Sequence, residues 1–504
     1  MNLTMLLEMA AGADPERVAV GTREDGITYG ELFARSTALA DRFRRSGAQH
    51  VAFLDLNSPS VPTVLFAAAA AGIPFAPLNY RLTDEQIDHS LGRLEPVIVV
   101  AGESSAPRID SREGVTILGQ GASSAEPVPT DVASGFVDPD ESAVLLFTSG
   151  TTGAPKAAVL RHRHLTNYIV TTVEFWNAGE DEAILVSVPN YHIAGISSIL
   201  SSVYSGRRIV YMPSFNPEEW VRLAAREAIT HAMVVPTMLG RILDVLETTR
   251  TSLPVLRSLS YGGGRMPVHT VERAMRLLPS TDFVNAYGLT ETSSTISVLG
   301  PDDHRDALAS DDPAVRARLG SVGRPLPTLE ISIRDGDGRE VPVGEAGEVF
   351  VRGEQVAGEY TSHSALDEDG WYPTRDRGHL DSGGFLFLDG RADDVIVRGA
   401  ENISPGEIED VLVEHPMVAE AAAIGVPDRE WGERIEVVIV TAASTAPTET
   451  ELQEWVRARL RSTRVPTRVH FWDELPYNDT GKLLRRVLRD ALVAHAEMQE
   501  VMAP

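Results

Sequence analysis

The chain of 504 residues contains no cysteine. It therefore cannot form a disulfide, bind a metal through a thiolate or use a cysteine nucleophile, so any thiol chemistry must come from a substrate. Positive charge is also scarce, because 45 lysines and arginines face 72 aspartates and glutamates. The net charge of −27 repels nucleic acid and anionic membranes, which argues against both as main partners.

Lysine is nearly absent. Only Lys156 and Lys482 occur, so 43 of the 45 basic residues are arginines (45 − 2). Both lysines stand in glycine-bearing polar stretches, 148–156 and 478–482, whereas lysines left by chance would more often lie on solvated helix faces. A compact ammonium on a flexible stem reaches phosphate or carboxylate oxygens where a planar guanidinium would not fit. Both positions are therefore candidates for anion binding.

Long apolar runs are missing too. The two uncharged stretches, 61–80 and 184–206, are interrupted by prolines and polar residues, and a membrane-spanning helix needs about 20 predominantly apolar residues. Residues 1–8 carry no basic leader and include Glu8, which predicts no secretory signal. We expect a cytoplasmic protein without a membrane span.

Apolar strand-like runs alternate with amphipathic helical stretches, which is the pattern of an α/β fold. From about Leu329 the pattern changes to short alternating strands separated by glycine turns. A chain of this length exceeds one compact core, so we predict an N-terminal domain at 1–392, made of layered α/β subdomains with a small β-barrel-like subdomain, and a small α+β domain at 393–504. The expected strands are 143–147, 183–188, 208–212, 231–235, 283–284, 330–334, 347–352, 384–388, 419–425 and 435–441, and the expected helices include 217–227, 405–415 and 449–460.

A loop rich in hydroxyls and glycines follows the predicted strand 143–147. Glycines let backbone N–H groups close on an anion and hydroxyls add donors, so the loop favours phosphate binding. It is not a Walker P-loop, because Pro155 and Ala157 stand where that motif needs glycine and Ser or Thr; a purely structural turn is the alternative. The candidate residues are Thr148, Ser149, Gly150, Thr151, Thr152, Gly153 and Lys156.

The stretch 285–292 gathers an aromatic ring, a hydroxyl and a carboxylate. Tyr287 can stack on a base, Thr290 can donate to a phosphate and Glu291 can hold Mg²⁺. By itself the stretch could also be a helix start with Thr290 as N-cap. The glycine triplet Gly262, Gly263 and Gly264 would allow a ligand to lie against bare backbone.

Taken together, nine stretches occur in the order of the adenylate-forming superfamily. They are 148–156, 189–195, 261–267, 285–292, 320–325, 374–376, 390–393, 399–405 and 480–482. The chain resembles an acyl-CoA synthetase of that superfamily, from about Thr28 to Arg486. Such enzymes make an acyl-adenylate from a carboxylate and ATP, release pyrophosphate, and pass the acyl group to a thiol, usually that of CoA.

The resemblance assigns roles to individual residues. Lys482 would be the adenylation lysine, Glu291 the Mg²⁺ ligand, and Thr290 the donor to the α-phosphate. The loop at 148–156 would hold the β- and γ-phosphates. The nucleotide site would include Tyr287 stacked on adenine against Gly262–Gly264, Asp376 and Arg391 on the ribose, and Asn285, Ala286 and Gly288.

The resemblance also implies movement and an acyl pocket. Asp393 matches the hinge about which the C-terminal domain swings after adenylation, bringing Gly399 and Ala400 to a pantetheine tunnel. His192 matches a pocket-gating position, with a satisfied core histidine as the alternative. Small residues, among them Gly195, Gly264 and Gly288, would leave volume for a medium or long acyl chain or a ring.

The chain departs from the family pattern at several positions. Arg375 and Arg377 flank Asp376 where glycine and an apolar residue are usual, which adds positive charge beside the expected ribose site. Ala400 replaces a common glycine and Arg464 a frequent lysine. Two alternative functions stay open: an acyl-AMP ligase that loads a carrier protein, and a non-catalytic nucleotide or acyl sensor on the same fold. A homodimer is an open option for the assembly.

Overall fold

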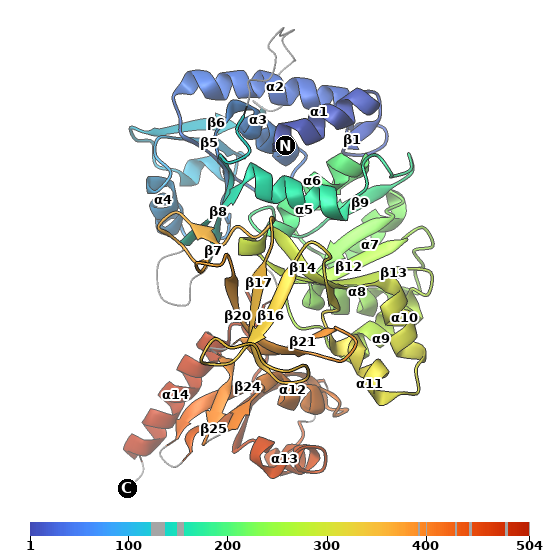
Figure 1. Cartoon of the computed structure of the whole chain (residues 1–504), viewed down its shortest axis with the longest axis vertical. Coiled ribbons are helices and arrows are strands. Elements are labelled where there is room, and N and C mark those ends of the chain that lie inside the picture. The colour runs from blue at the N-terminus through green and yellow to red at the C-terminus, as the bar shows by residue number, and fades with distance from the viewer. Residues whose placement is uncertain are drawn as a thin grey trace.

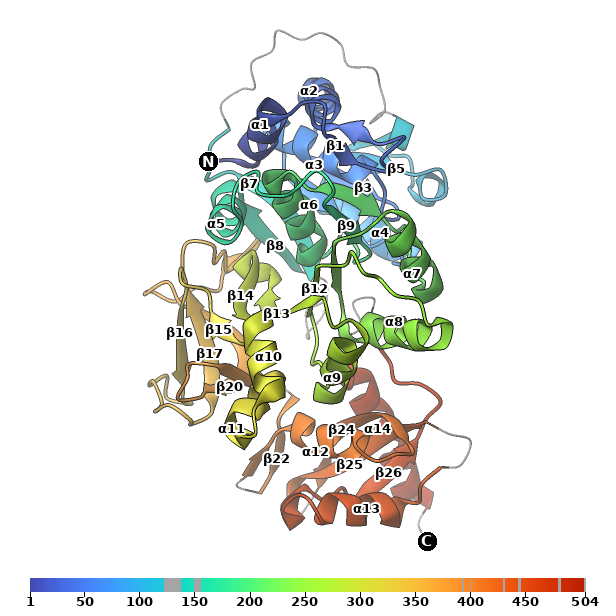
Figure 2. The ribbon, with the colours of Figure 1, turned by 90° about the vertical axis from the view of Figure 1, so that its right-hand side faces the viewer.

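The computed structural model describes residues 1–121, 137–148, 156–391, 394–399, 401–428, 431–442, 446–478 and 482–502. In these residues the chain forms four β-sheets. Figures 1 and 2 show the N-terminal two-thirds at one end of an elongated molecule and the C-terminal residues, in orange and red, at the other.

The largest sheet has nine strands in the order β15-β14-β13-β12-β11-β9-β10-β1-β2. Its centre, from β10 to β13, is parallel, while β14 and β15 run antiparallel at one edge. The strands are β1 (Val18–Val20), β2 (Ile27–Thr28), β9 (Ala183–Val186), β10 (Arg208–Tyr211), β11 (His231–Val234), β12 (Ser258–Gly262), β13 (Asp282–Leu289), β14 (Ser294–Leu299) and β15 (Arg324–Pro325).

A second sheet has eight strands in the order β19-β18-β8-β7-β4-β3-β5-β6. Its edge is built by residues far away in sequence, because β18 pairs with β8 through Tyr360 and Ala158. The strands are β3 (His50–Leu54), β4 (Phe75–Pro77), β5 (Val97–Ala101), β6 (Val115–Gly119), β7 (Ser142–Thr148), β8 (Lys156–Arg161), β18 (Glu359–Tyr360) and β19 (His363–Ser364).

Helices cover both large sheets. Buried apolar residues of α1, α2, α3 and α6 form one core with β3, β4, β7, β9 and β10, so these helices join the two sheets. A second core packs α7, α8 and α9 on the other face of the nine-stranded sheet. The helices are α1 (Leu3–Ala13), α2 (Tyr29–Ser46), α3 (Ser60–Ala71), α4 (Asp84–Gly92), α5 (His162–Thr172), α6 (Ile193–Ser205), α7 (Pro217–Arg226), α8 (Pro236–Thr249), α9 (Val268–Leu277), α10 (Pro301–Ala309) and α11 (Pro313–Arg316), with short 3₁₀ helices η1 (Ala106–Arg108), η3 (Thr290–Thr292) and η4 (Ala317–Gly320).

A four-stranded antiparallel sheet, β16 (Glu330–Arg334), β17 (Gly347–Arg352), β20 (Tyr372–Leu380) and β21 (Leu386–Arg391), forms the expected β subdomain. The strand β20 bulges between its pairs Phe350–Pro373 and Glu348–Arg377, where it has three residues and β17 has one. Bulges of this kind redirect side chains.

The C-terminal part has its own sheet and its own core. The strands are β22 (Ile396–Arg398), β23 (Glu401–Ile403), β24 (Val418–Asp428), β25 (Gly432–Thr441) and β26 (Arg468–Phe471). The helices α12 (Pro405–Val413) and α13 (Glu449–Arg457) contribute to one buried cluster, α14 (Arg485–Met502) contributes to another, and η6 (Ser462–Arg464) is a short 3₁₀ helix.

The expected α/β architecture, with a large N-terminal part and a small C-terminal one, is confirmed. The predicted strands and helices lie within a few residues of the observed ones. The main difference is β13, which continues to Leu289 where the sequence predicted a short strand at 283–284. Among the described residues, no helix has both the length and the apolarity needed to cross a membrane.

Candidate active site

The expected nucleotide-binding residues gather at the carboxyl end of the parallel strands, the usual place for ligands in such sheets. Gly262 ends β12 and pairs with Ala286 of the neighbouring β13. Gly263, with a φ of +81°, turns the chain beyond this edge, and both it and Gly264 are exposed. The glycine triplet and the stretch 285–292 are not neighbours in the sequence. The register of β12 and β13 places them side by side.

Tyr287, Asp376 and Arg391 form one hydrogen-bonded and ion-paired group. The Tyr287 hydroxyl donates to Asp376 Oδ2 at 2.5 Å, and Arg391 Nε lies 3.4 Å from Asp376 Oδ1. Burial raises the pKa of Asp376, and the nearby Arg391 guanidinium opposes that shift. Adjacent strands hold the pair, because Asp376 of β20 is opposite Arg391 of β21.

Lys482 reaches this group from the C-terminal part of the chain. Its residue is exposed, yet the surrounding protein desolvates the ammonium and lowers its pKa, as does the Arg391 charge. Asp376 and Asp394 act in the opposite direction. The Lys482 ammonium and the Asp376 carboxylate, 106 residues apart in the chain (482 − 376), are therefore electrostatic neighbours.

Glu291 is buried and held in place by a tyrosine. The Tyr360 hydroxyl donates to Glu291 Oε1 at 2.5 Å, and the Glu291 carbonyl accepts from Ala357 and Gly358 N–H groups, both at 2.9 Å. Within the described part of the chain, Oε2 of Glu291 has no hydrogen-bond partner. One oxygen is thus fixed and the other is free to bind a cation.

The two ends of the predicted phosphate loop, Thr148 and Lys156, belong to the paired strands β7 and β8. The two residues are opposite each other in the last pair of these strands, and the Thr148 hydroxyl donates to the Lys156 carbonyl at 3.3 Å. Lys156 Nζ lies 5.7 Å from the centre of the Tyr360 ring, which brings the lysine next to the Tyr360–Glu291 pair. The other predicted loop residues, Ser149, Gly150, Thr151, Thr152 and Gly153, lie outside the described residues.

Magnesium chemistry fits this arrangement. Mg²⁺ is usually held by one or two carboxylates together with substrate phosphates and water, not by an all-protein cage. The described residues contain no group of three or more histidines and carboxylates that could hold a metal by themselves. A single free carboxylate oxygen of Glu291 beside a predicted phosphate loop matches the first pattern.

Two of the expected pocket glycines, Gly195 and Gly288, lie directly against neighbouring backbone. A Cβ at Gly195 would lie 2.6 Å from the Pro189 carbonyl oxygen, and a Cβ at Gly262 or Gly288 would overlap the Ala286 or Ser294 carbonyl. The prediction that Gly195 and Gly288 leave acyl-pocket volume is therefore wrong, because backbone fills that space. These glycines permit close packing of neighbouring segments instead.

His192 precedes α6, and its ring packs against Tyr191 at a tilt of 54°, with ring centres 4.6 Å apart. Asn285 uses its side-chain amide to donate to the Ser321 carbonyl at 3.0 Å. The alternative that Thr290 is an N-cap is wrong, since Leu289 holds the cap position of η3.

Gly399, expected on the thiol route, packs against the Trp431 ring, which lies 3.5 Å from the position that a Cβ would take. Asp393 and Ala400 lie outside the described residues.

Two of the unusual arginines are engaged by the protein itself. Arg377 donates to the Ala346 carbonyl at 3.0 Å, and Arg464 pairs with Glu401 and with Glu407, the latter at 3.2 Å. The Arg377 guanidinium therefore binds the backbone carbonyl just before β17 and, among the described residues, makes no hydrogen bond or ion pair with Asp376 of the expected ribose site.

Contacts between the N- and C-terminal parts were not predicted. Arg265, which follows the glycine triplet, pairs with Asp410 of α12, and its guanidinium occupies the space that a Cβ at Gly406 would need. The Ser404 hydroxyl donates to the Asp389 carbonyl of β21. Neither pair could be predicted from the sequence, because no local pattern links Arg265 with Asp410 or Ser404 with Asp389.

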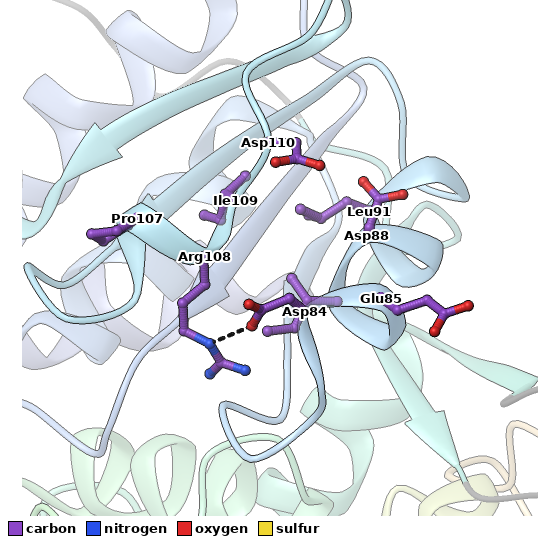
Figure 3. Close-up of a pocket in the computed structure, with 9 residues that line it drawn as sticks. Asp84, Glu85, Asp88, Leu91, Pro107, Arg108, Ile109 and Asp110 are labelled. Atoms are coloured by element: carbon purple, nitrogen blue, oxygen red, sulfur yellow. Dashed lines mark hydrogen bonds and ion pairs between the residues drawn. The ribbon is translucent and has the colours of Figure 1, made fainter.

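A separate pocket lies between α4 and η1 (Figure 3). Arg108 pairs there with Asp84 at 2.8 Å, and further carboxylates line the pocket. Such a charge distribution disfavours phosphate and carboxylate ligands, so the catalytic chemistry does not belong to this pocket.

Family models match most of the chain. Residues 7–361 match the AMP-binding enzyme family and residues 407–482 match the AMP-binding enzyme C-terminal domain. The chain belongs to the adenylate-forming superfamily.

Curated relatives and solved structures resemble the chain over nearly its whole length. It is 31% identical over 512 residues to the fatty acid–[acyl-carrier-protein] ligase ScoC of Streptomyces coeruleorubidus, covering 97% of this chain and 96% of that protein. It is 33% identical over 500 residues to the 2-succinylbenzoate–CoA ligase of Bacillus licheniformis, covering 96% and 98%. The o-succinylbenzoate CoA synthetase MenE of Bacillus subtilis, solved with its acyl-adenylate intermediate, superposes with a TM-score of 0.82 at 28% identity over 96% of this chain and 98% of that one. MenE has also been solved with ATP and a magnesium ion.

Proposed function

We propose that this adenylate-forming enzyme is an ATP-dependent acid–thiol ligase that activates a carboxylic acid as acyl-AMP and transfers the acyl group to CoA. In the first half-reaction a carboxylate oxygen attacks the α-phosphorus of ATP, and the bond to pyrophosphate breaks. In the second, the CoA sulfur attacks the acyl carbon and AMP leaves. Activation is needed because a carboxylate is a poor electrophile at neutral pH.

One observation carries the proposal: Lys482 of the C-terminal part is an electrostatic neighbour of Asp376 and Arg391. An ammonium in this place would offset negative charge on the carboxylate and the α-phosphate as the new bond forms. This coupling supports a role for Lys482 in the adenylation half-reaction.

The remaining groups fit the parts of ATP. Asp376 and Arg391 would hold the ribose, with Tyr287 stacked on adenine beside Gly263 and Gly264. Thr290 would donate to the α-phosphate, and the loop ending at Lys156 would hold the β- and γ-phosphates. Mg²⁺ bound at Glu291 would supply further positive charge, with Tyr360 holding the carboxylate in position.

Transfer to CoA would follow a rotation of the C-terminal domain. We place the domain boundary at 392/393 and the hinge at Asp393. The rotation would remove Lys482 from the nucleotide and bring Gly399 and Ala400 to the thiol route. The residues of the C-terminal part have their own buried clusters, which supports movement as a unit.

The acid would be a medium or long fatty acid or a ring-bearing acid. ScoC is named for a fatty acid and the Bacillus relative for 2-succinylbenzoate, so the curated relatives cover both classes. Transfer to a carrier protein is the second candidate, since ScoC is named as an acyl-carrier-protein ligase. A homodimer and a cytoplasmic location stay predictions.

The test is a panel of fatty and aromatic acids assayed for ATP-dependent pyrophosphate release, followed by AMP release with CoA or with an acyl carrier protein. Pyrophosphate release with at least one acid, and CoA-dependent AMP release with the same acid, are the expected results. AMP release with a carrier protein alone would favour the second candidate. No pyrophosphate release with any acid, despite ATP binding, would favour a non-catalytic sensor.

A further inference from the structure

The chain is strained directly after Thr290 and Glu291, the two residues expected to meet the α-phosphate and Mg²⁺. Ser293 follows η3 and Ser294 begins β14, and their φ values are +57° and +125°, where an L side chain is disfavoured. Strain of this kind persists where the surrounding structure enforces it, often at functional sites. The groups that hold these two serines in place therefore help to position Thr290 and Glu291.

Gln355, in the segment that follows β17, holds this turn with its side-chain amide. Its Nε2 donates to the Thr292 carbonyl at 3.1 Å and to the Thr295 carbonyl at 2.8 Å. The two carbonyls lie on either side of Ser293 and Ser294, so one amide group spans the strained pair. Because both carbonyl oxygens can only accept, the nitrogen end of the amide must face them.

The backbone at this place needs a donor from outside the sheet. The strand β14 bulges between its pairs Tyr287–Ser297 and Gly288–Thr295, where two steps along β14 match one step along β13. A bulge disrupts the ladder and leaves a residue unpaired, and a buried carbonyl without a donor is costly. Gln355 supplies the donor to the carbonyl at this bulge.

The rest of the same segment binds Glu291. The N–H groups of Ala357 and Gly358 donate to the Glu291 carbonyl, both at 2.9 Å, and the Tyr360 hydroxyl donates to its Oε1 at 2.5 Å. Residues 355–360 thus hold the backbone and the carboxylate of Glu291 as well as the turn that follows it.

Gln355 can act only through its neighbours. Its side chain is fully buried, with 0% exposed, so it does not touch a ligand. Its Oε1 has no hydrogen-bond partner among the described residues, and a buried amide oxygen without a donor is unfavourable. An apolar side chain of the same length would avoid that cost, so the amide is explained by the two bonds that its nitrogen donates to the turn.

We propose that Gln355 is a positioning residue for adenylation, which holds the turn at 293–294 so that the Thr290 hydroxyl and the Glu291 carboxylate are correctly placed for ATP. The inference rests on the proposed function. Both residues lie within two positions of the Thr292 carbonyl that Gln355 holds. A misplacement of about 1 Å can cost about 100-fold in rate, so loss of the amide should slow the reaction in a protein that still folds.

The experiment compares the full-length wild type with two variants of nearly the same side-chain length. Gln355→Met loses both donors, and Gln355→Glu, when ionised, presents only acceptors to the two carbonyls. The matched control is Thr281→Val, which removes a buried hydroxyl that donates to the Leu256 carbonyl at 2.8 Å. Thr281 directly precedes β13, whereas η3 follows the other end of that strand. If Gln355→Met does not fold, Gln355→Asn, whose amide is one methylene shorter, takes its place.

Three quantities are measured: the melting temperature, hydrogen exchange of residues 286–299 without ligand, and the kcat and KM of pyrophosphate release at a temperature where every variant is folded. In Gln355→Met the Ser293 amide, which donates to the Thr290 carbonyl at 3.1 Å, should exchange about 10-fold faster, as for the loss of hydrogen bonds. Its kcat should fall about 10- to 100-fold, with KM for the acid changed less than about threefold. Gln355→Glu should be at least as slow.

Thr281→Val should lower the melting temperature and leave both the exchange of 286–299 and kcat unchanged. An unchanged kcat in Gln355→Met would overturn the inference, as would unchanged exchange of the Ser293 amide. An equal fall of kcat in Thr281→Val would also overturn it, because a general loss of stability would then explain the effect. Absence of pyrophosphate release from the wild type with every acid would instead overturn the proposed function, and the exchange measurement separates the two because it does not depend on activity.

Discussion

At the scale of single residues, hydrogen bonds and ion pairs between side chains hold the two carboxylates of the candidate site, Asp376 and Glu291, in position. Asp376 accepts from Tyr287 and pairs with Arg391, and Tyr360 fixes one oxygen of Glu291. The Tyr360 contact leaves the second carboxylate oxygen of Glu291 available for a ligand. Substitution of one side chain at a time tests the role of each group.

Lys482→Ala should lower the rate of pyrophosphate release about 100-fold or more, because a cation aimed at developing charge is worth that much in comparable sites. Thioesterification of synthetic acyl-AMP should continue, since that half-reaction would take place with Lys482 turned away. Lys482→Arg should also be slow, because a planar guanidinium does not replace a compact ammonium. A full adenylation rate in Lys482→Ala would contradict the role given to this residue.

Tyr360→Phe should raise the Mg²⁺ concentration for half-maximal pyrophosphate release by about tenfold, because the Glu291 carboxylate loses a charged hydrogen bond. Rates at saturating Mg²⁺ should return close to the wild-type value. The control is Tyr29→Phe, which removes a buried hydroxyl from α2. The same change of Mg²⁺ requirement in both variants would show a general loss of stability and not a local effect.

At the scale of the elements, the start of α5 makes the N-terminal domain sensitive to acid. Burial lowers the pKa values of His162 and His164 to about 4, and the neutral His162 ring accepts from the Leu3 N–H at 3.3 Å. In the unfolded chain the imidazoles of His162 and His164 bind protons below about pH 6.5. In the folded chain they bind protons only near pH 4. The free energy of unfolding therefore falls as the pH decreases through this range.

Protonation of His162 should lower the free energy of unfolding by about 3 kcal/mol when the pH is well below 4, because its pKa differs by about 2.5 between the unfolded and folded chain. Denaturant titrations at pH 7.5 and 4.5 should show the N-terminal domain losing less stability on acidification in His162→Gln than in the wild type. The exposed His89→Gln on α4 is the control. Equal acid sensitivity in all three proteins would show that His162 does not cause it.

The elements themselves were largely predictable and the contacts between them were not. Runs such as 143–147 and 347–352 have strong apolar patterns, so their strands were found. The continuation of β13 to Leu289 was missed because glycine and polar residues interrupt the pattern, while pairing with β12 and β14 decides the outcome. Tyr360 was missed because it lies 69 residues from Glu291, on a strand of two residues.

The glycines show a second limit of prediction from sequence. A missing side chain at Gly195 or Gly288 is compatible with an empty pocket and with close backbone packing, and only the fold tells them apart. Arg375 departs from the family pattern, but its left-handed backbone conformation appears only once β20 and its bulge are known.

At the scale of the whole molecule, the two parts of the chain meet in the arrangement proposed for adenylation. Arg265 pairs with Asp410 and fills the space above Gly406, and Arg485 of α14 lies 3.8 Å from Asp394. The first pair joins the two parts, so it should favour the first half-reaction over the second.

Asp410→Asn should slow pyrophosphate release by about twofold to fivefold, the range for a half-exposed ion pair, and leave the thioesterification of synthetic acyl-AMP unchanged or faster. Both rates are measured in single-turnover experiments. Glu272→Gln, which removes the partner of Arg316 within the N-terminal part, should change neither rate. Equal slowing of both half-reactions in Asp410→Asn would contradict a conformational role for the pair.

The shortage of lysine described at the outset has a practical consequence. Apart from the N-terminus, an amine-reactive reagent has only two targets, one in each part of the chain, and both lie at the candidate active site. A short bifunctional reagent that joined them within one molecule would tether the C-terminal part to the β7–β8 hairpin. The rate of that cross-link, followed by mass spectrometry during turnover, would report how often the two amines approach each other.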